Sequence, residues 1–248
     1  MATLASNPFP IRRDADRNAF LIFVGIVWVG ILSGFGTDSF QHVSAHGLDY
    51  PWIVHVHAVS FVSWLTLFTV QASLIRGGRP DLHRRLGVAG AILAGWMLII
   101  GPATAIVVDA WHYRTSGQTP EFLAVQFTDM VAFAGLAGSG LLLRANPGEH
   151  KRLMLLSLFD LSDAGFARFL NELATMPFGQ GRVSEFASLY LASDLLALAW
   201  GAYDLATRRR LHPVYVAALA WMLTLQLLAS FLLHSEGWKA ISLRLIGA

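Results

Sequence analysis

An apolar stretch of 23 residues, from Ile53 to Ile75, constrains this chain more than any other part of its sequence. It contains no Asp, Glu, Lys or Arg. At a rise of about 1.5 Å per residue, a helix of this length spans the roughly 30 Å hydrocarbon core of a bilayer. Trp52 precedes the stretch and Arg76 follows it, as is typical of the two membrane interfaces. The stretch therefore predicts a transmembrane helix.

The rest of the chain repeats this plan. Only 14% of its residues are charged, against roughly 25% in soluble domains, and the deficit runs along the whole chain. The first expected span carries Gly25, Gly30 and Gly34, which allow another helix to approach closely. We expect an all-α fold, a seven-helix transmembrane bundle in a single domain over residues 1–248. The expected spans are residues 19–36, 53–75, 86–108, 122–143, 153–170, 184–206 and 214–233.

Lysine and arginine collect on one side of these spans. The N-terminal tail (residues 1–18) and the loops after the second, fourth and sixth spans hold thirteen of them. The opposite loops and the C-terminal tail (residues 234–248) hold four, and Arg168 lies within the fifth span. Because basic loops stay in the cytoplasm, we expect a cytoplasmic N-terminal tail and an external C-terminal tail.

A histidine beside basic residues recurs in the three expected cytoplasmic turns. The histidines are His83, His150 and His212, spaced 67 and 62 residues apart. The spacing predicts one helix followed by three degenerate helical hairpins, although basic loops also resemble one another by selection alone. For these histidines we favour a structural role, either bonding to loop carbonyls or meeting anionic lipid head groups.

Several short motifs occur in a specific order over residues 50–248: HVH (55–57), LHRRLGVAGA (82–91), FTDMVAF (127–133), EHKRLMLL (149–156), and AYDL with RRRLHP (202–205 and 208–213). Together they resemble an uncharacterised family of bacterial seven-helix integral membrane proteins. The resemblance implies the same architecture and a multi-pass protein of the bacterial inner membrane, and it carries no established activity. His42 and His46 lie outside the matching region.

Four aspartates lie inside the expected spans and away from the span ends: Asp129, Asp160, Asp163 and Asp194; Glu185 and Asp204 lie near the two ends of the sixth span. An ionised Asp near mid-bilayer costs at least about 2.5–3.5 kcal/mol, so each must face the bundle interior and be paired, protonated or metal-bound. We expect Asp129 and Asp194 to lie in the same neighbourhood. Arg168 is the one embedded cation and the obvious partner for a carboxylate. A purely structural polar network remains open beside a catalytic role for Asp129, Asp163, Asp194 and Arg168.

Histidines gather at the expected outer face. His57 lies deepest, and with Asp129 and Asp194 it would form an outer pocket able to hold Zn, Cu or Fe. A haem would need His57 together with His112 or His234. Hydrogen-bonded histidines without metal remain the alternative. The remaining candidate ligands are His42, His46, His55 and His112.

The composition excludes several classes of function. The chain has no cysteine, so Fe–S clusters and thiolate sites are excluded. No lysine lies in an expected span, which argues against a retinal Schiff base, and nothing supports nucleic-acid binding. Three functions stay open: a metal- or haem-dependent enzyme acting on a lipophilic substrate, a proton- or cation-coupled transporter, and an accessory subunit of a larger membrane complex. Beyond the lipid bilayer, other membrane subunits are the expected partners.

Overall fold

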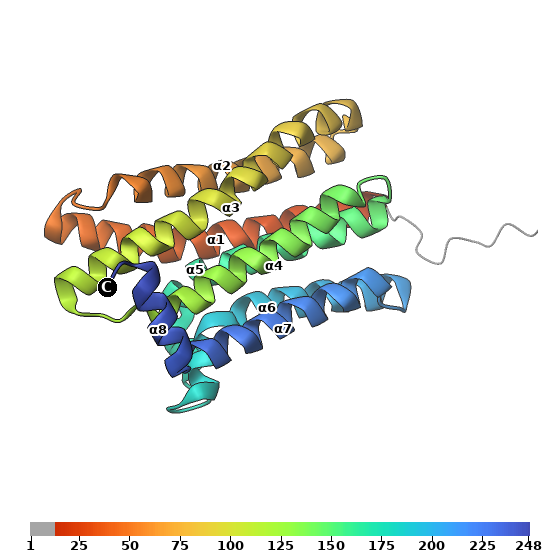
Figure 1. Cartoon of the computed structure of the whole chain (residues 1–248). Coiled ribbons are helices and arrows are strands. Elements are labelled where there is room, and N and C mark those ends of the chain that lie inside the picture. Colours follow the sequence, from red (N-terminus) through yellow and green to blue (C-terminus); the bar gives the residue numbers. More distant parts are fainter. Residues whose placement is uncertain (1–12) are drawn as a thin grey trace, which may run out of the picture.

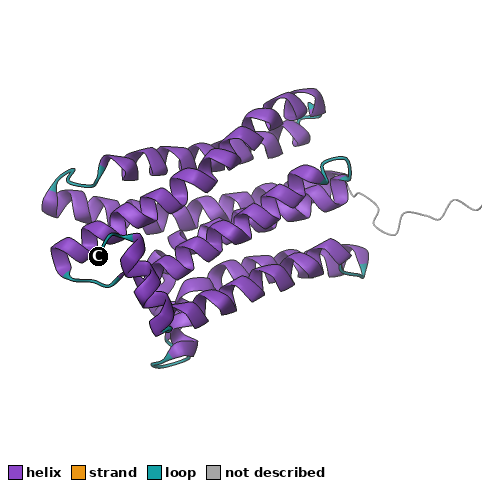
Figure 2. Ribbon diagram, in the orientation of Figure 1, coloured by secondary structure: helices purple, strands orange, loops and turns teal. Residues whose placement is uncertain are grey.

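The computed structural model describes residues 13–248, with side chains from Asp16 onward, and this part of the protein is built from helices alone (Figure 1, Figure 2). No strand occurs among the described residues, so the prediction of an all-α fold is confirmed. The elements in chain order are α1 (Arg13–His46), α2 (Trp52–Arg76), α3 (Pro80–Ser116), the short 3-10 helix η1 (Pro120–Phe122), α4 (Leu123–Leu142), α5 (Pro147–Thr175), α6 (Arg182–Arg208), α7 (Pro213–Leu233) and α8 (Glu236–Leu245).

Short turns close three helical hairpins, α2–α3, α4–α5 and α6–α7. The second helix of each hairpin begins at a proline: Pro80, Pro147 or Pro213. Proline suits this position because its ring fixes a helical φ and its missing N–H would have no helical partner there. Gly117 ends α3 with a φ of 72°, in the left-handed region that favours glycine.

Several helices extend beyond the spans expected from hydropathy. The gap between the first two expected spans predicts an outer loop at residues 37–51. This prediction is wrong for most of the loop, because α1 continues to His46. Polar residues such as Asp38 can continue a helix outside the hydrocarbon core, since the backbone hydrogen bonds do not require apolar side chains. The expected tail at residues 1–18 becomes helical at Arg13, and residues 1–12 lie outside the described part.

Helix α5 lies at the centre of the bundle and packs against α1, α4, α6 and α7. From Arg152 to Phe166 nearly all of its side chains are buried, including Leu155, Leu156 and Phe159 with no exposed surface. The surrounding helices instead expose many large apolar side chains, such as Ile22 and Phe231. A polar central helix inside an apolar shell is the arrangement expected in a lipid environment.

Two glycines bring α1 against α5. A methyl group added at Gly34 would overlap the carbonyl oxygen of Gly165, and one added at Gly30 would overlap the ring of Phe166. Gly25, by contrast, faces open space. The close approach of α1 to α5 therefore depends on Gly30 and Gly34.

In the described part of the chain, six helices are long and apolar enough to cross a membrane: α1, α2, α3, η1 with α4, α6 and α7. The chain runs back and forth, so the start of α1 and the three hairpin turns gather at one end of the bundle (Figure 1). We call this the N-terminal end. The opposite end, which holds the loops at residues 47–51 and 176–181 together with α8, is called the C-terminal end.

Candidate functional site

Four aspartates on three helices form a carboxylate cluster inside the bundle. Asp160 and Asp163 lie one turn apart on α5 and are 2% and 4% exposed. Asp129 on α4 and Asp194 on α6 are half-buried, and both lie close enough to act on the two α5 carboxyl groups through their charge. The structure thus brings Asp129 and Asp194 into the same neighbourhood, with α5 between them.

Polar side chains from α6 and α7 complete this carboxylate cluster. Gln226 donates from Nε2 to Asp194 Oδ1 at 3.0 Å. Ser193 lies beside Asp163, while its hydroxyl donates to the carbonyl oxygen of Tyr190. The Tyr190 side chain is fully buried and lies near all four carboxyl groups.

Several buried polar atoms in the carboxylate cluster lack a hydrogen-bond partner among the described residues. They are both carboxyl oxygens of Asp163, Oδ2 of Asp160, the hydroxyl of Tyr190 and Oε1 of Gln226. Buried polar groups normally find partners, so a cluster of unpaired ones calls for an explanation. The unpaired atoms of the carboxylate cluster could form hydrogen bonds once some of the carboxyl groups are protonated, or with a small polar ligand.

The two arginines of α5 point away from the carboxylate cluster. The expectation that Arg168 pairs with one of the embedded carboxylates is wrong: its Nε lies 3.4 Å from Asp38 Oδ2, and its guanidinium covers the ring of Phe35. Five residues separate Asp163 from Arg168, so the two side chains leave α5 on different faces. The charges that act on Asp160 and Asp163 come from other carboxylates.

His57 lies outside this carboxylate cluster. Its ring stacks on Phe61 at 4.1 Å, and its buried Nδ1 has no hydrogen-bond partner. It makes no ion pair or hydrogen bond with Asp129 or Asp194 among the described residues. The expected outer pocket of one imidazole and two carboxylates is therefore not formed by direct contacts.

The other outer histidines are spread over the C-terminal end. His42 Nε2 lies 2.6 Å from Asp49 Oδ1, its ring stacks on Tyr50, and His46 lies beside it. The hydrogen bond from His42 holds the pKa of Asp49 below its usual value. His234 Nε2 pairs with Glu185 at 2.8 Å. His55 is exposed, and His112 contacts Trp111.

Across residues 13–248 no three His, Asp or Glu side chains are grouped so that they could hold a metal ion. The metal site at His57, Asp129 and Asp194 stays a prediction without geometric support. The same holds for His42, His46, His55 and His112 as ligands.

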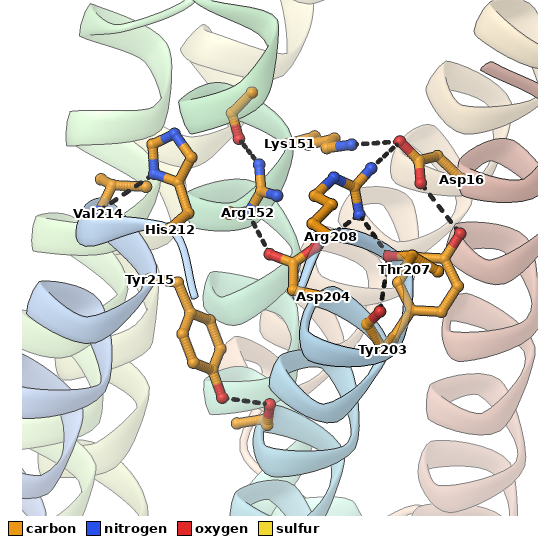
Figure 3. A network of polar contacts seen from close by, with 12 residues as sticks. Asp16, Lys151, Arg152, Tyr203, Asp204, Thr207, Arg208, His212, Val214 and Tyr215 are labelled. Carbon is orange, nitrogen blue, oxygen red and sulfur yellow. Dashed lines mark hydrogen bonds and ion pairs between the residues drawn. The ribbon is translucent and has the colours of Figure 1, made fainter. Parts of the chain in front are cut away.

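A second polar cluster, which sequence reasoning missed, lies at the N-terminal end (Figure 3). Arg152 on α5 donates from Nε to Asp204 Oδ2 at 2.6 Å, and Arg208 on α6 donates to the other oxygen of Asp204 at 2.7 Å. Arg208 also donates to Asp16 on α1. We call these residues, with Lys151 and Tyr203, the ion network.

Asp16 ties α1 into the ion network. Lys151 Nζ donates to its Oδ2 at 2.7 Å, and the Tyr203 hydroxyl donates to its Oδ1 at 2.9 Å. Sequence reasoning placed Asp16 in a polar tail, where it looked like an ordinary solvated charge. The pair Asp204 and Arg208, four residues apart on one helix face, is a sequence signal for a polar cluster at this place, although it does not identify Asp16 as a member.

The turn histidines have the structural roles that we favoured, with one variation. His150 Nδ1 lies 2.7 Å from the carbonyl oxygen of Gly140 and so fastens α5 to α4, while the ring of His83 on α3 packs against the ring of His150 at 6.1 Å. His212 instead caps α7, where its Nδ1 accepts the backbone N–H of Val214.

Comparison of the chain with family models, with curated proteins and with solved structures found no match. The resemblance to a family of bacterial seven-helix membrane proteins therefore stays a prediction, and the geometry of the two polar clusters is what bears on function.

Proposed function

We propose that this protein carries protons across a membrane and that the carboxylate cluster is its proton-binding site. One observation supports this most: four carboxyl groups on α4, α5 and α6 lie together inside an apolar bundle, while Arg152 and Arg168 are paired elsewhere. Ionisable groups inside membrane bundles commonly mark proton paths.

Each ionised Asp costs at least about 2.5–3.5 kcal/mol at the centre of a bilayer, and adjacent negative charges raise that cost further. The cluster lowers this cost by holding protons, because a protonated carboxyl group is neutral and also becomes a hydrogen-bond donor. Tyr190 and Ser193 add hydroxyl groups that can both donate and accept, as a proton relay requires.

We further propose that α5 is a seventh transmembrane span and that the N-terminal end faces the cytoplasm. Because α5 carries many polar side chains, its hydropathy does not identify it as a span. Its 29 residues are nevertheless long enough to span the bilayer. The thirteen-to-four distribution of basic residues supports the orientation. The motif resemblance supports the bacterial inner membrane as its location.

An enzyme with a metal or haem has less support than proton transport, because the described His, Asp and Glu side chains are not grouped to hold a metal. If the protein is instead an accessory subunit whose polar clusters are purely structural, substitutions of the carboxylates should change its stability alone.

The test measures proton flux in liposomes that contain the purified protein, a trapped pH-sensitive dye and an imposed membrane potential. Asp163→Asn should lower the flux by roughly tenfold or more, because an amide cannot exchange a proton as a carboxyl group does. Asp38→Asn, which removes an exposed carboxylate, is the matched control and should keep the flux. Equal flux in both variants, or no flux above that of empty liposomes, would reject the proposal.

A further inference from the structure

The carboxylate cluster and the ion network share two helices, α5 and α6, on which one lies above the other. Asp160 and Arg152 are eight residues apart on α5, and Asp194 and Asp204 are ten apart on α6. At about 1.5 Å per residue these separations are roughly 12 and 15 Å. A proton that leaves the cluster toward the N-terminal end must therefore pass the segment between the two clusters and then the network.

A fully buried tryptophan fills that segment. Trp200 on α6 has no exposed surface, and its Nε1 has no hydrogen-bond partner among residues 16–248. Its ring stacks on Tyr203 at 5.3 Å and meets the edges of Phe20 and Phe23 on α1 at 6.2 and 5.5 Å. The packing of Trp200 thus depends on the position of α1. The Nε1–H of Trp200 is a buried donor beside these aromatic side chains.

The ion network holds α1 in that position. Asp16 is bound by Lys151 of α5 and by Arg208 and Tyr203 of α6, so three helices meet at one carboxylate (Figure 3). Asp16 and Asp204 carry two negative charges, whereas Lys151, Arg152 and Arg208 carry three positive ones. Removing the charge of Asp16 leaves Arg208 and Lys151 short of partners, and buried charges without partners strongly destabilise the arrangement that holds them.

We infer that Trp200 and the ion network form the barrier that closes the carboxylate cluster from the N-terminal end, and that Asp16 holds this barrier shut. The inference rests on the proposed proton transport and names the residues that control access to its site. When Asp16 loses its partners, the start of α1 separates from α5 and α6, and Phe20 and Phe23 withdraw from Trp200. The cluster then becomes accessible from that side.

The absence of cysteine from the chain allows a clean test. Ser193→Cys places one thiol beside Asp163, at a site with no exposed surface. The rate at which a charged, membrane-impermeant methanethiosulfonate labels this thiol is measured from each side of the membrane, in inside-out and in right-side-out vesicles. The background variants are Asp16→Asn, Tyr203→Phe, which removes only the hydroxyl that bonds Asp16, and Asp38→Asn as a control at the opposite end.

Asp16→Asn should speed labelling from the side of the N-terminal end by about tenfold or more, and Tyr203→Phe should speed it less, from the same side. Asp38→Asn should leave it unchanged. Unchanged labelling in both network variants would overturn the inference. An equal rise in labelling from both sides would also overturn it, since the loss of a purely structural contact would loosen the whole bundle. Labelling does not require transport, so failure here is separable from failure of the Asp163→Asn flux test.

Discussion

Arg152 on α5 and Asp204 on α6 form an ion pair with an Nε–Oδ2 distance of 2.6 Å, and their side chains are 1% and 0% exposed. Asp204 is a buried carboxylate that neutralises two arginines. Its removal is costly, because neither arginine can be rehydrated in the buried site. Asp204 also accepts from Arg208 at 2.7 Å, so its removal affects two cations at once.

Asp204→Asn is therefore expected to lower the free energy of unfolding by about 3–5 kcal/mol, the range found when one partner of a buried pair is removed. Thermal unfolding in detergent measures the effect. The matched control is Asp81→Asn, which breaks the pair with Arg79 at 3.4 Å, where both side chains are 57% exposed. Exposed pairs contribute at most about 1 kcal/mol. Similar losses in the two variants would contradict a buried role for Asp204.

The contact of Gly34 with Gly165 predicts a steric effect. Gly34→Ala should destabilise the bundle by about 1–3 kcal/mol, because the added methyl group meets a backbone carbonyl that cannot move aside. Gly36→Ala is the control, since that position faces open space, and there alanine should be neutral or stabilise the helix by up to about 1 kcal/mol. Unfolding of both variants in detergent decides the point. A Gly34→Ala protein as stable as the control would show that α1 and α5 are not in close contact.

The proposed seventh span has its own test. Reporter fusions at Pro147 and Gly179, which flank most of α5, should lie on opposite sides of the membrane, with Pro147 in the cytoplasm. A further fusion at Gly117 should lie outside. If Pro147 and Gly179 report the same side, α5 does not cross the membrane. If all three sides are reversed, the orientation drawn from the basic residues is wrong.

The placement of His57 predicts how its variants behave. His57→Phe should keep proton flux and should leave the metal content of the purified protein unchanged, because the ring stacks on Phe61 and makes no hydrogen bond or ion pair with Asp129 or Asp194 among the described residues. Elemental analysis and a visible spectrum accompany the flux measurement. Loss of a stoichiometric metal, or of a haem absorption band, in His57→Phe alone would restore the metal or haem enzyme as the better proposal.

The sequence predicts the helices more reliably than their contacts. The apolar run 53–75 gives α2 (Trp52–Arg76) almost to the residue, because both of its ends coincide with the change from apolar to polar residues. Hydropathy missed the last ten residues of α1, since helix continues outside the hydrocarbon core wherever backbone bonding allows it. It also gives no hint that α5, the most polar of the seven long helices in the described part of the chain, is the central one.

Partners across helices were harder to foresee. The cost of ionised carboxylates in a membrane was enough to direct Asp129 and Asp194 inward. It could not tell that Arg168 turns to Asp38, because that depends on the rotation of α5 about its axis. Asp16 could not be recognised at all, because its burial comes from Lys151 and Arg208, which are more than 130 residues away in the chain.

Infrared spectroscopy of the carboxyl groups tests the central claim most directly, because the C=O stretch of a protonated acid is separate from the bands of a carboxylate. The account predicts a protonated-acid band in the wild-type protein at neutral pH, a weaker band in Asp160→Asn and in Asp163→Asn, and no change in Asp38→Asn. A wild-type protein with no protonated-acid band at neutral pH, or with one that both cluster variants leave at full strength, would contradict the proton-binding role of the carboxylate cluster.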